Sequence, residues 1–188
     1  MTRLILVRHG ESSHGVRRGL LDAAGVQQWR DAYDLAGITD RSMPPQTLVR
    51  RVADATHIVA SDLPRAIASA ERLAGGRRIH TSPLLREIPL PIPRLPMRAP
   101  LAAWGTAMHL AWSYRVVRRD KSADELARVG AAIEWLTSVA GSELTVVVTH
   151  GVFRSSLARE LLRLGWVSEG RKGGFSHWSE WTFARFDS

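Results

Sequence analysis

The sequence predicts a three-layer α/β/α sandwich, in which helices cover both faces of a mostly parallel sheet that has one antiparallel edge strand. Short apolar runs, typical of strands buried on both faces, predict the sheet. Segments with apolar residues at helical spacing alternate with these runs, as they do where helices connect parallel strands. A chain of 188 residues with 45% hydrophobic content suffices for one core, so we expect a single domain over residues 1–188.

The first half of the chain contains three predicted strands separated by helices. Residues 4–7 form the first apolar run, which ends in a polar turn at Arg8-His9-Gly10. Apolar residues then recur at helical spacing between residues 26 and 33, and Gly37 ends the pattern. The further elements predicted here are a strand at residues 57–60, a helix at 63–74 and a strand at 78–81.

Residues 88–118 form a proline-rich loop followed by a helix. Trp104, Met108 and Trp112 stand four residues apart, which predicts a helix through about residue 117. The simplest interpretation is a core helix with its lead-in. The alternative is an excursion that covers the pocket and shapes it for a bulky or partly apolar leaving group.

The last third of the chain repeats the order of helix, strand and helix. Ser122 and Glu125 form a capping box that starts a helix with an apolar stripe, and Gly141 ends this helix. The remaining predictions are a strand at residues 144–148, a helix at 151–164 and a last strand at 178–186, which we place at the antiparallel edge.

The composition limits the classes of function and the compartment. The net charge of +8 comes almost entirely from arginine and favours anionic ligands, phosphates above all. The arginines are scattered along the chain, which argues against a nucleic-acid surface. Because there is no cysteine, disulfides, thiol catalysis and cysteine-bound zinc are excluded. No apolar run approaches the length of a membrane span or of a signal-peptide core, so we expect a cytoplasmic protein without a membrane partner.

Polar residues follow several of the predicted strands at their carboxyl ends. Arg8 and His9 follow the first strand, a turn leading to Arg65 follows the second, His150 follows the strand at 144–148, and Glu87 follows the third. Parallel strands bring their carboxyl ends to one edge of a sheet, where ligands bind. Imidazole can attack phosphorus, guanidinium groups can neutralise its oxygens, and a carboxylic acid can protonate the departing oxygen. The set therefore predicts phosphoryl transfer.

Four segments of the chain resemble the motifs of the histidine phosphatase superfamily, in the branch that includes cofactor-dependent phosphoglycerate mutase. Residues 6–12 (Leu-Val-Arg-His-Gly-Glu-Ser) are similar to the signature of this family, and residues 61–66 are similar to its second arginine segment. Residues 85–88 resemble its acid segment and residues 149–151 its second histidine. An Arg-His-Gly triplet alone is a weak signal, whereas four elements in order at strand ends are specific.

The resemblance implies a fold, an activity and a role for each residue. The fold is phosphoglycerate mutase-like, and the activity is hydrolysis of a phosphate monoester without metal or organic cofactor. His9 would become phosphorylated, Arg8, Arg65 and His150 would bind the phosphate oxygens, and Glu87 would donate a proton to the leaving group. Glu87 needs a raised pKa to act as an acid near neutral pH.

Several alternatives remain open at this stage. The proton donor could be Glu11 or Asp62, because the prolines after Ile88 depart from the usual text of the family. Ser12 could donate to the phosphate or cap its own turn. A phosphomutase is the second candidate enzyme, although residues 12–15 lack the asparagine that phosphoglycerate mutases carry there.

The partners are predicted only as classes. The substrate is a small phosphate ester, with a phosphoprotein as an alternative, and a dimer could form by pairing of the aromatic carboxyl-terminal strand. A hypothesis from a different class of function is a module that binds RNA, a phosphoprotein or another anion and has lost catalysis. The histidines show no metal-ligand spacing, so no metal site is expected.

Overall fold

The computed structural model describes residues 1–15, 18–96, 98–118 and 123–186 of the chain. The strands are β1 (Thr2–Arg8), β2 (Leu20–Leu21), β3 (His57–Ser61), β4 (Ile79–Ser82), β5 (Ala99–Pro100), β6 (Leu144–Thr149), β7 (Val167–Lys172) and β8 (Glu180–Arg185). The helices are α1 (Ala23–Asp34), α2 (Gln46–Arg51), α3 (Pro64–Ala74), the 3-10 helix η1 (Pro83–Leu85), α4 (Leu101–Val117), α5 (Ala123–Ala140) and α6 (Gly151–Arg163).

The main sheet has the strand order β4-β3-β6-β1-β8-β7. Strands β4, β3, β6 and β1 are parallel, β8 is antiparallel to β1, and β7 is antiparallel to β8. The predicted fold class is therefore confirmed, including its antiparallel edge. That edge consists of two strands, because β7 lies outside the predicted strand β8. The sequence gives no apolar signal for β7, since every residue of this strand is exposed.

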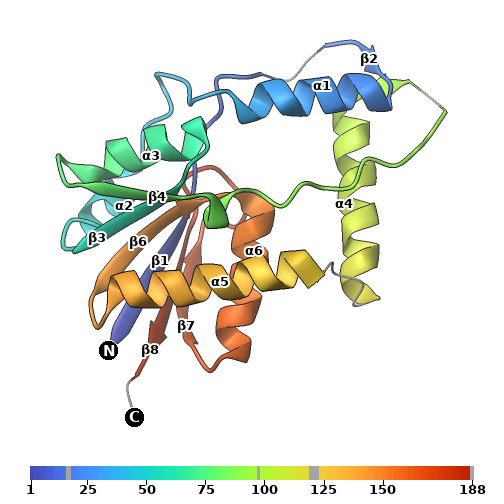
Figure 1. The fold of residues 1–188 in the computed structure, drawn as a ribbon. Helices are drawn as coiled ribbons and strands as arrows, with labels where there is room; N and C mark the ends of the chain where they lie inside the picture. Colours follow the sequence, from blue (N-terminus) through green and yellow to red (C-terminus); the bar gives the residue numbers. More distant parts are fainter. Residues whose placement is uncertain (16–17, 97, 119–122, 187–188) are drawn as a thin grey trace.

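The buried runs of the parallel strands are explained by helices on both faces of the sheet (Figure 1). Along β1, Leu4 and Leu6 pack into the core beneath α5 and α6, whereas Ile5 and Val7 pack into the core on the side of α2 and α3. This alternation follows from the two-residue repeat of a strand. Each residue of the apolar run is therefore buried, and the strand ends are held in fixed register.

A smaller unit lies beside these layers and is built from β2, β5, α1 and α4 (Figure 1). Its core contains Leu21, Val26, Trp104 and Met108 together with two further buried residues. The indole Nε1 of Trp104 donates a hydrogen bond to the carbonyl of Leu21 over 2.8 Å, which ties α4 to β2. The predicted helix in residues 88–118 is confirmed as α4, and it packs in this small core and not against the sheet.

The remaining predicted elements agree with the structure apart from their ends. Proline at the first position starts α3, and Gly75 ends it in the left-handed conformation with φ 55°. The predicted capping residue Ser122 lies outside the described residues. Strand β8 is paired on both sides, so the predicted dimer cannot form by pairing at the edge of this strand. In the described part of the chain, no helix is long and apolar enough to span a membrane.

Candidate active site

The parallel pairing of β1 with β6 brings His9 and His150 together. Arg8 lies opposite Thr149 in the ladder, and the backbone N–H of His9 donates to the carbonyl of Thr149 over 3.0 Å. The two imidazole rings follow directly, and their centroids are 5.1 Å apart. Both rings are buried, with 2% of His9 and none of His150 exposed. Two residues that are far apart in the sequence therefore face each other at the carboxyl edge of the sheet.

The surroundings of His9 determine which ring nitrogen can react. Its Nδ1 lies 2.7 Å from the carbonyl oxygen of Gly10. Because a carbonyl can only accept, Nδ1 must carry the hydrogen, and Nε2 of the neutral ring keeps its lone pair. Burial, followed by the positive charges of Arg65 and Arg8, holds the pKa of His9 well below its usual value. The ring is thus a neutral base with a free Nε2.

Gly10 permits the close packing behind this ring. A Cβ at this position would lie 2.6 Å from Ser42 Oγ and from the ring of Trp178, which leaves no room for a side chain. The backbone N–H of Gly10 donates to Ser69 Oγ on α3 over 2.8 Å. The loop that presents His9 is therefore fixed by α3 and by the segment before β8.

His150 has two buried ring nitrogens that meet no hydrogen-bond partner among the described residues. Buried polar atoms normally have a partner, so an oxygen-rich ligand at this point would satisfy one of them. Burial is the main cause that lowers the pKa of His150 well below its usual value, and the nearby His9 and Arg65 lower it further. In its neutral form, His150 can donate one N–H to a phosphate oxygen.

Arg65 is a buried guanidinium on α3, with 1% of its side chain exposed. Its Nη1 donates to the carbonyl of Tyr33 and its Nη2 to Asp34, each over 3.0 Å, and its Cζ lies 4.3 Å from the centre of the Tyr33 ring. Its Nε has no hydrogen-bond partner in the part of the chain that the structure describes. Since a guanidinium has five N–H groups, donors remain for a phosphate after the end of α1 has oriented the group.

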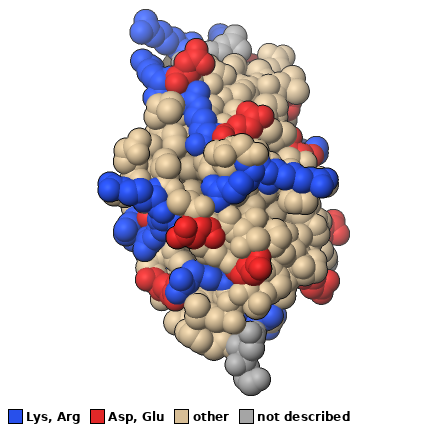
Figure 2. Space-filling model, turned by 90° about the vertical axis from the view of Figure 1, so that its left-hand side faces the viewer, with Lys and Arg blue, Asp and Glu red and all other residues tan. Residues whose placement is uncertain are grey.

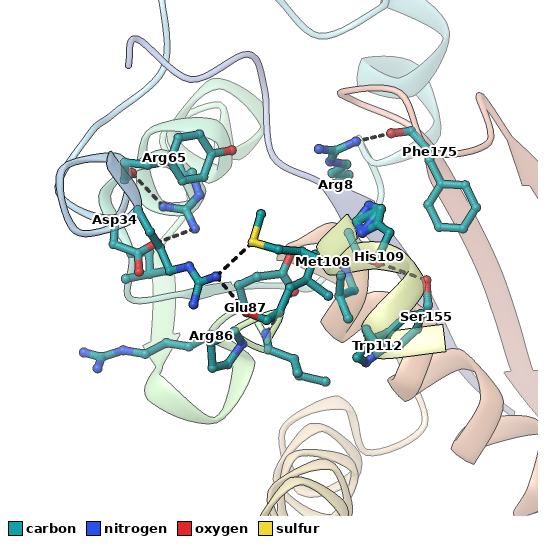
Figure 3. Close-up of a pocket in the computed structure, with 18 of the residues that line it drawn as sticks. Arg8, Asp34, Arg65, Arg86, Glu87, Met108, His109, Trp112, Ser155 and Phe175 are labelled. Atoms are coloured by element: carbon teal, nitrogen blue, oxygen red, sulfur yellow. Dashed lines mark hydrogen bonds and ion pairs between the residues drawn. The ribbon is translucent and has the colours of Figure 1, made fainter. Parts of the chain in front are cut away.

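Arg8 lies on the opposite side of the cavity from Arg65 and Asp34 (Figure 3). It donates a hydrogen bond to the carbonyl of Phe175. Gly151 lies beside it, because a Cβ at this position would be 3.6 Å from Arg8 Nε and 4.0 Å from Glu87 Oε2. The glycine at the start of α6 therefore leaves the space between the arginine and the carboxyl group open.

Glu87 is held at the first turn of α6. Its Oε1 accepts from the backbone N–H of Phe153 over 2.8 Å and of Ile88 over 3.0 Å, and its Oε2 accepts from Val152 over 3.2 Å. Burial raises the pKa of Glu87, and these backbone N–H groups oppose the shift without cancelling it. A carboxyl group in this position can carry a proton at a higher pH than a solvated glutamate.

The two alternative acids lie in different surroundings. Asp62 is bound by Arg86 through two hydrogen bonds of 2.7 and 2.6 Å, and Glu11 is exposed. Neither residue lines the cavity, whereas Glu87 does. The geometry thus favours Glu87 as the proton donor over both alternatives.

Ser12 is buried, but its hydroxyl accepts a hydrogen bond from the backbone N–H of His14 over 3.2 Å. This is the turn-capping arrangement, and Ser12 does not line the cavity. Its contact with phosphate stays a prediction.

Sequence reasoning missed His177, whose ring centre lies 5.8 Å from that of His9. No motif marks His177, because it reaches the site from an irregular loop.

Arg154 is a second residue that the sequence did not single out. It is fully buried on α6 and donates to the carbonyls of Ser179 and Gly174, over 2.7 and 2.9 Å. Burial lowers its pKa to about 9. These bonds hold the loop whose Phe175 carbonyl receives Arg8. Arg154 therefore acts on the site through the loop.

A cavity of about 970 Å³ opens above these groups. Arg8, Arg65 and Glu87 lie in its wall, whereas His9 and His150 are buried and do not line it. Much of the remaining wall is aromatic or aliphatic and comes from α1, α4 and the loop at 88–90 (Figure 3). No group of three or more residues that could bind a metal ion occurs among the side chains that the structure describes.

The charge on one face of the molecule differs from that of a typical nucleic-acid interface. On the face shown in Figure 2, arginine and lysine side chains are interspersed with acidic ones. Nucleic-acid binding normally uses a continuous basic patch or stripe. This face therefore does not favour the binding-module hypothesis.

The sequence matches the family model of the histidine phosphatase superfamily (branch 1) over residues 4–173. No curated protein matched. The fold is similar to that of a phosphoserine phosphatase from Entamoeba histolytica in complex with 3-phosphoglyceric acid (19% identity, TM-score 0.55, 87% of this chain and 81% of that chain). It is also similar to a mycobacterial glucosyl-3-phosphoglycerate phosphatase (20% identity, TM-score 0.60, 100% and 92%). At these identities the likeness shows a shared fold.

Proposed function

Because the chain belongs to the histidine phosphatase superfamily (branch 1), we propose that it is a metal-independent phosphatase that hydrolyses a phosphate monoester through a phosphohistidine at His9. Membership of the superfamily supports a phosphatase or a phosphomutase. The observation that carries the proposal is the position of His9, a buried neutral imidazole with a free Nε2 beside His150 and between Arg8 and Arg65. Such a site offers one nucleophile and a set of donors for the phosphate oxygens.

The first chemical step transfers the phosphoryl group to the enzyme. Nε2 of His9 attacks the phosphorus atom, and the bond from phosphorus to the ester oxygen breaks. Glu87 gives its proton to the departing oxygen, which leaves as an alcohol. The two arginines neutralise the phosphoryl oxygens in place of a metal ion, because guanidinium stays charged at every relevant pH.

The second step returns the enzyme to its starting state. A water molecule attacks the phosphorus atom of the phosphohistidine and passes a proton to the Glu87 carboxylate. The bond from phosphorus to nitrogen breaks, so that inorganic phosphate is released and His9 is again neutral. The same carboxyl group thus serves as acid in one step and as base in the other.

The direct test replaces the nucleophile. We expect His9→Ala to lower kcat/KM for 4-nitrophenyl phosphate by about 10⁵-fold, the scale observed when a nucleophile is removed. The control His80→Gln changes a histidine on β4 outside the site and should keep full activity. Excess EDTA should leave the wild type active. Activity that survives His9→Ala, or that is lost with EDTA, would contradict the proposal.

The alternatives predict different results in the same assays. A phosphomutase would transfer the group to a second alcohol and release little inorganic phosphate, and a binding module would show salt-dependent RNA affinity without turnover.

We further propose that residues 88–118 shape the substrate pocket. Since the chain has no cysteine, which fits a reducing compartment, the cytoplasm stays our prediction for its location.

A further inference from the structure

The cavity is much larger than a phosphoryl group, so most of it must be filled by the leaving group or by water. Trp29 and Tyr33 of α1 stack on each other, with ring centroids 5.0 Å apart and an angle of 23° between the planes. Met108 and Trp112 of α4 and Leu90 add further apolar surface to the wall. A volume of about 970 Å³ is at the upper end of the range for small-molecule sites.

Three of the arginines in this wall are already paired with protein atoms. Arg30 donates to the carbonyl of Leu90 over 2.7 Å, and Arg86 is bound to Asp62. Arg65, as described above, is paired with Asp34. Beside these three arginines a leaving group rich in hydroxyl groups would therefore find few free partners, and burying its polar groups without hydrogen bonds would be unfavourable.

Trp112 is the wall residue outside the phosphoryl site whose buried polar atom lacks a partner within the described parts of the chain, as the Nε atoms of Arg8 and Arg65 do within that site. Its indole Nε1 is buried and has no hydrogen-bond partner among the described residues. Its ring lines the cavity from α4 (Figure 3). The ring can therefore provide apolar surface for a leaving group.

We infer that the substrates are phosphate monoesters of bulky, largely apolar alcohols, and that Trp112 determines this specificity. The inference rests on the proposed phosphatase function and goes beyond it by naming the class of leaving group. The phosphoryl group occupies the site formed by Arg8, His9, Arg65 and His150. The apolar part of the alcohol lies between the stacked rings of α1 and the face of α4 that carries Met108 and Trp112, where it displaces water.

The test compares alkyl esters, because an aryl phosphate would react faster for chemical reasons alone, and the leaving alcohols of the phenylpropyl and propyl esters have similar basicity. For the wild type we expect kcat/KM for 3-phenylpropyl phosphate to exceed that for propyl phosphate and for phosphoserine by at least about tenfold, the discrimination that an apolar pocket provides for added apolar groups. Equal values, or a preference for phosphoserine, would overturn the inference and leave the phosphatase proposal intact. Hydrolysis of none of these esters would instead contradict the phosphatase proposal.

Substitutions at Trp112 then test whether this residue causes the preference for the phenylpropyl ester. Trp112→Ala should reduce the ratio between the phenylpropyl and propyl esters to within about threefold of one, mainly through KM, and Trp112→Phe should restore most of it. Tyr114→Ala is the matched control, because Tyr114 lies on the same helix, is 57% exposed and does not line the cavity. If the ratio survives Trp112→Ala, the assignment of specificity to Trp112 is wrong. If Trp112→Ala does not fold, the ratio in Trp112→Leu, which removes the aromatic ring and the N–H, decides instead.

Discussion

His9 and His150 lie at the ends of two hydrogen-bonded strands, whereas Met108 and Trp112 lie on α4, which stands apart from the sheet (Figure 1). The two histidines are thus held by the sheet and by cores on both of its faces. Among the described residues, the core beneath α5 and α6 contains 18 buried hydrophobic residues, whereas the core that holds α4 contains six. The difference suggests that the phosphoryl site is rigid and that the leaving-group site can vary without disturbing it.

The outer surface of α4 also differs from that of α5, a helix that covers the sheet. Leu110, Tyr114 and Val117 are exposed to 66%, 57% and 81%, so apolar residues lie on both sides of this helix. Helix α5 buries most of its apolar stripe instead, including Val129 and Ile133. Stability of α4 therefore depends on few contacts, and changes in this region should alter substrate preference more than the fold.

After His9, the largest effect is expected at Arg65. Replacing Arg65 by Met removes a guanidinium that neutralises the phosphoryl oxygens, and kcat/KM for any phosphate ester should fall by about 10³-fold. Arg65→Lys keeps the charge without the planar fork and should recover only part of the loss. The control Arg163→Met changes an arginine that is 67% exposed and paired with Glu160. A loss confined to bulky esters would place Arg65 in the leaving-group site instead.

A smaller effect that depends on substrate is expected at Glu87. Glu87→Gln should lower kcat/KM for propyl phosphate by about 10²-fold to 10³-fold, because the alkoxide then leaves without a proton. The loss for 4-nitrophenyl phosphate should stay below about tenfold, since nitrophenolate leaves unaided. Equal losses for both esters would contradict the role of Glu87 as an acid.

The pH dependence follows from the shifts of the same groups. Burial raises the pKa of Glu87 above its ordinary value of 4.5, so its acid form persists further toward neutral pH, and the first step should slow as pH rises through the shifted value. The lowered pKa of His9 keeps the nucleophile neutral on the acidic side. We expect kcat/KM for propyl phosphate to decline from mildly acidic toward alkaline pH, and this decline should vanish in Glu87→Gln. A flat profile for the wild type would contradict this account.

The smallest effect on the chemistry is expected in the core of the excursion. Trp104→Ala removes a buried indole from the small cluster and its bond to Leu21, so α4 should exchange its amide hydrogens faster while β1 and β6 keep their protection. Leu136→Ala in the larger core should instead lower the free energy of unfolding of the whole chain by about 2 to 5 kcal/mol. Equal loss of protection in α4 and the sheet for both variants would show that the two regions unfold as one.

The residues at the strand ends were more predictable from the sequence than the contacts that helices and loops make around them. A run such as residues 4–7 is buried on both faces, so its apolar letters alone indicate a central strand, and the polar residues that follow must lie at the sheet edge. The contacts of Arg65 with Tyr33 and Asp34 were not predictable, because they depend on where α1 ends in space. The position of His177 beside His9 was not predictable either, because it depends on how a loop folds in space and no sequence motif marks it.

The antiparallel edge of the sheet contains a strand that no sequence pattern could predict. Strand β8 was predicted from its aromatic residues and threonine, and these are buried. Strand β7 is exposed throughout and charged, so neither apolar run nor alternation marks it. It forms because β8 offers a free row of backbone donors and acceptors, which is a property of the assembled sheet.

The most direct test of the central claim is to trap the phosphorylated enzyme. Wild-type protein mixed rapidly with 3-phenylpropyl phosphate and quenched in alkali, which preserves phosphohistidine, should carry one phosphoryl group that peptide mass spectrometry assigns to His9. The phosphoryl group should form and decay at rates that account for turnover, with EDTA present throughout. Turnover without a phosphorylated intermediate, or a phosphoryl group on another residue, would contradict the account.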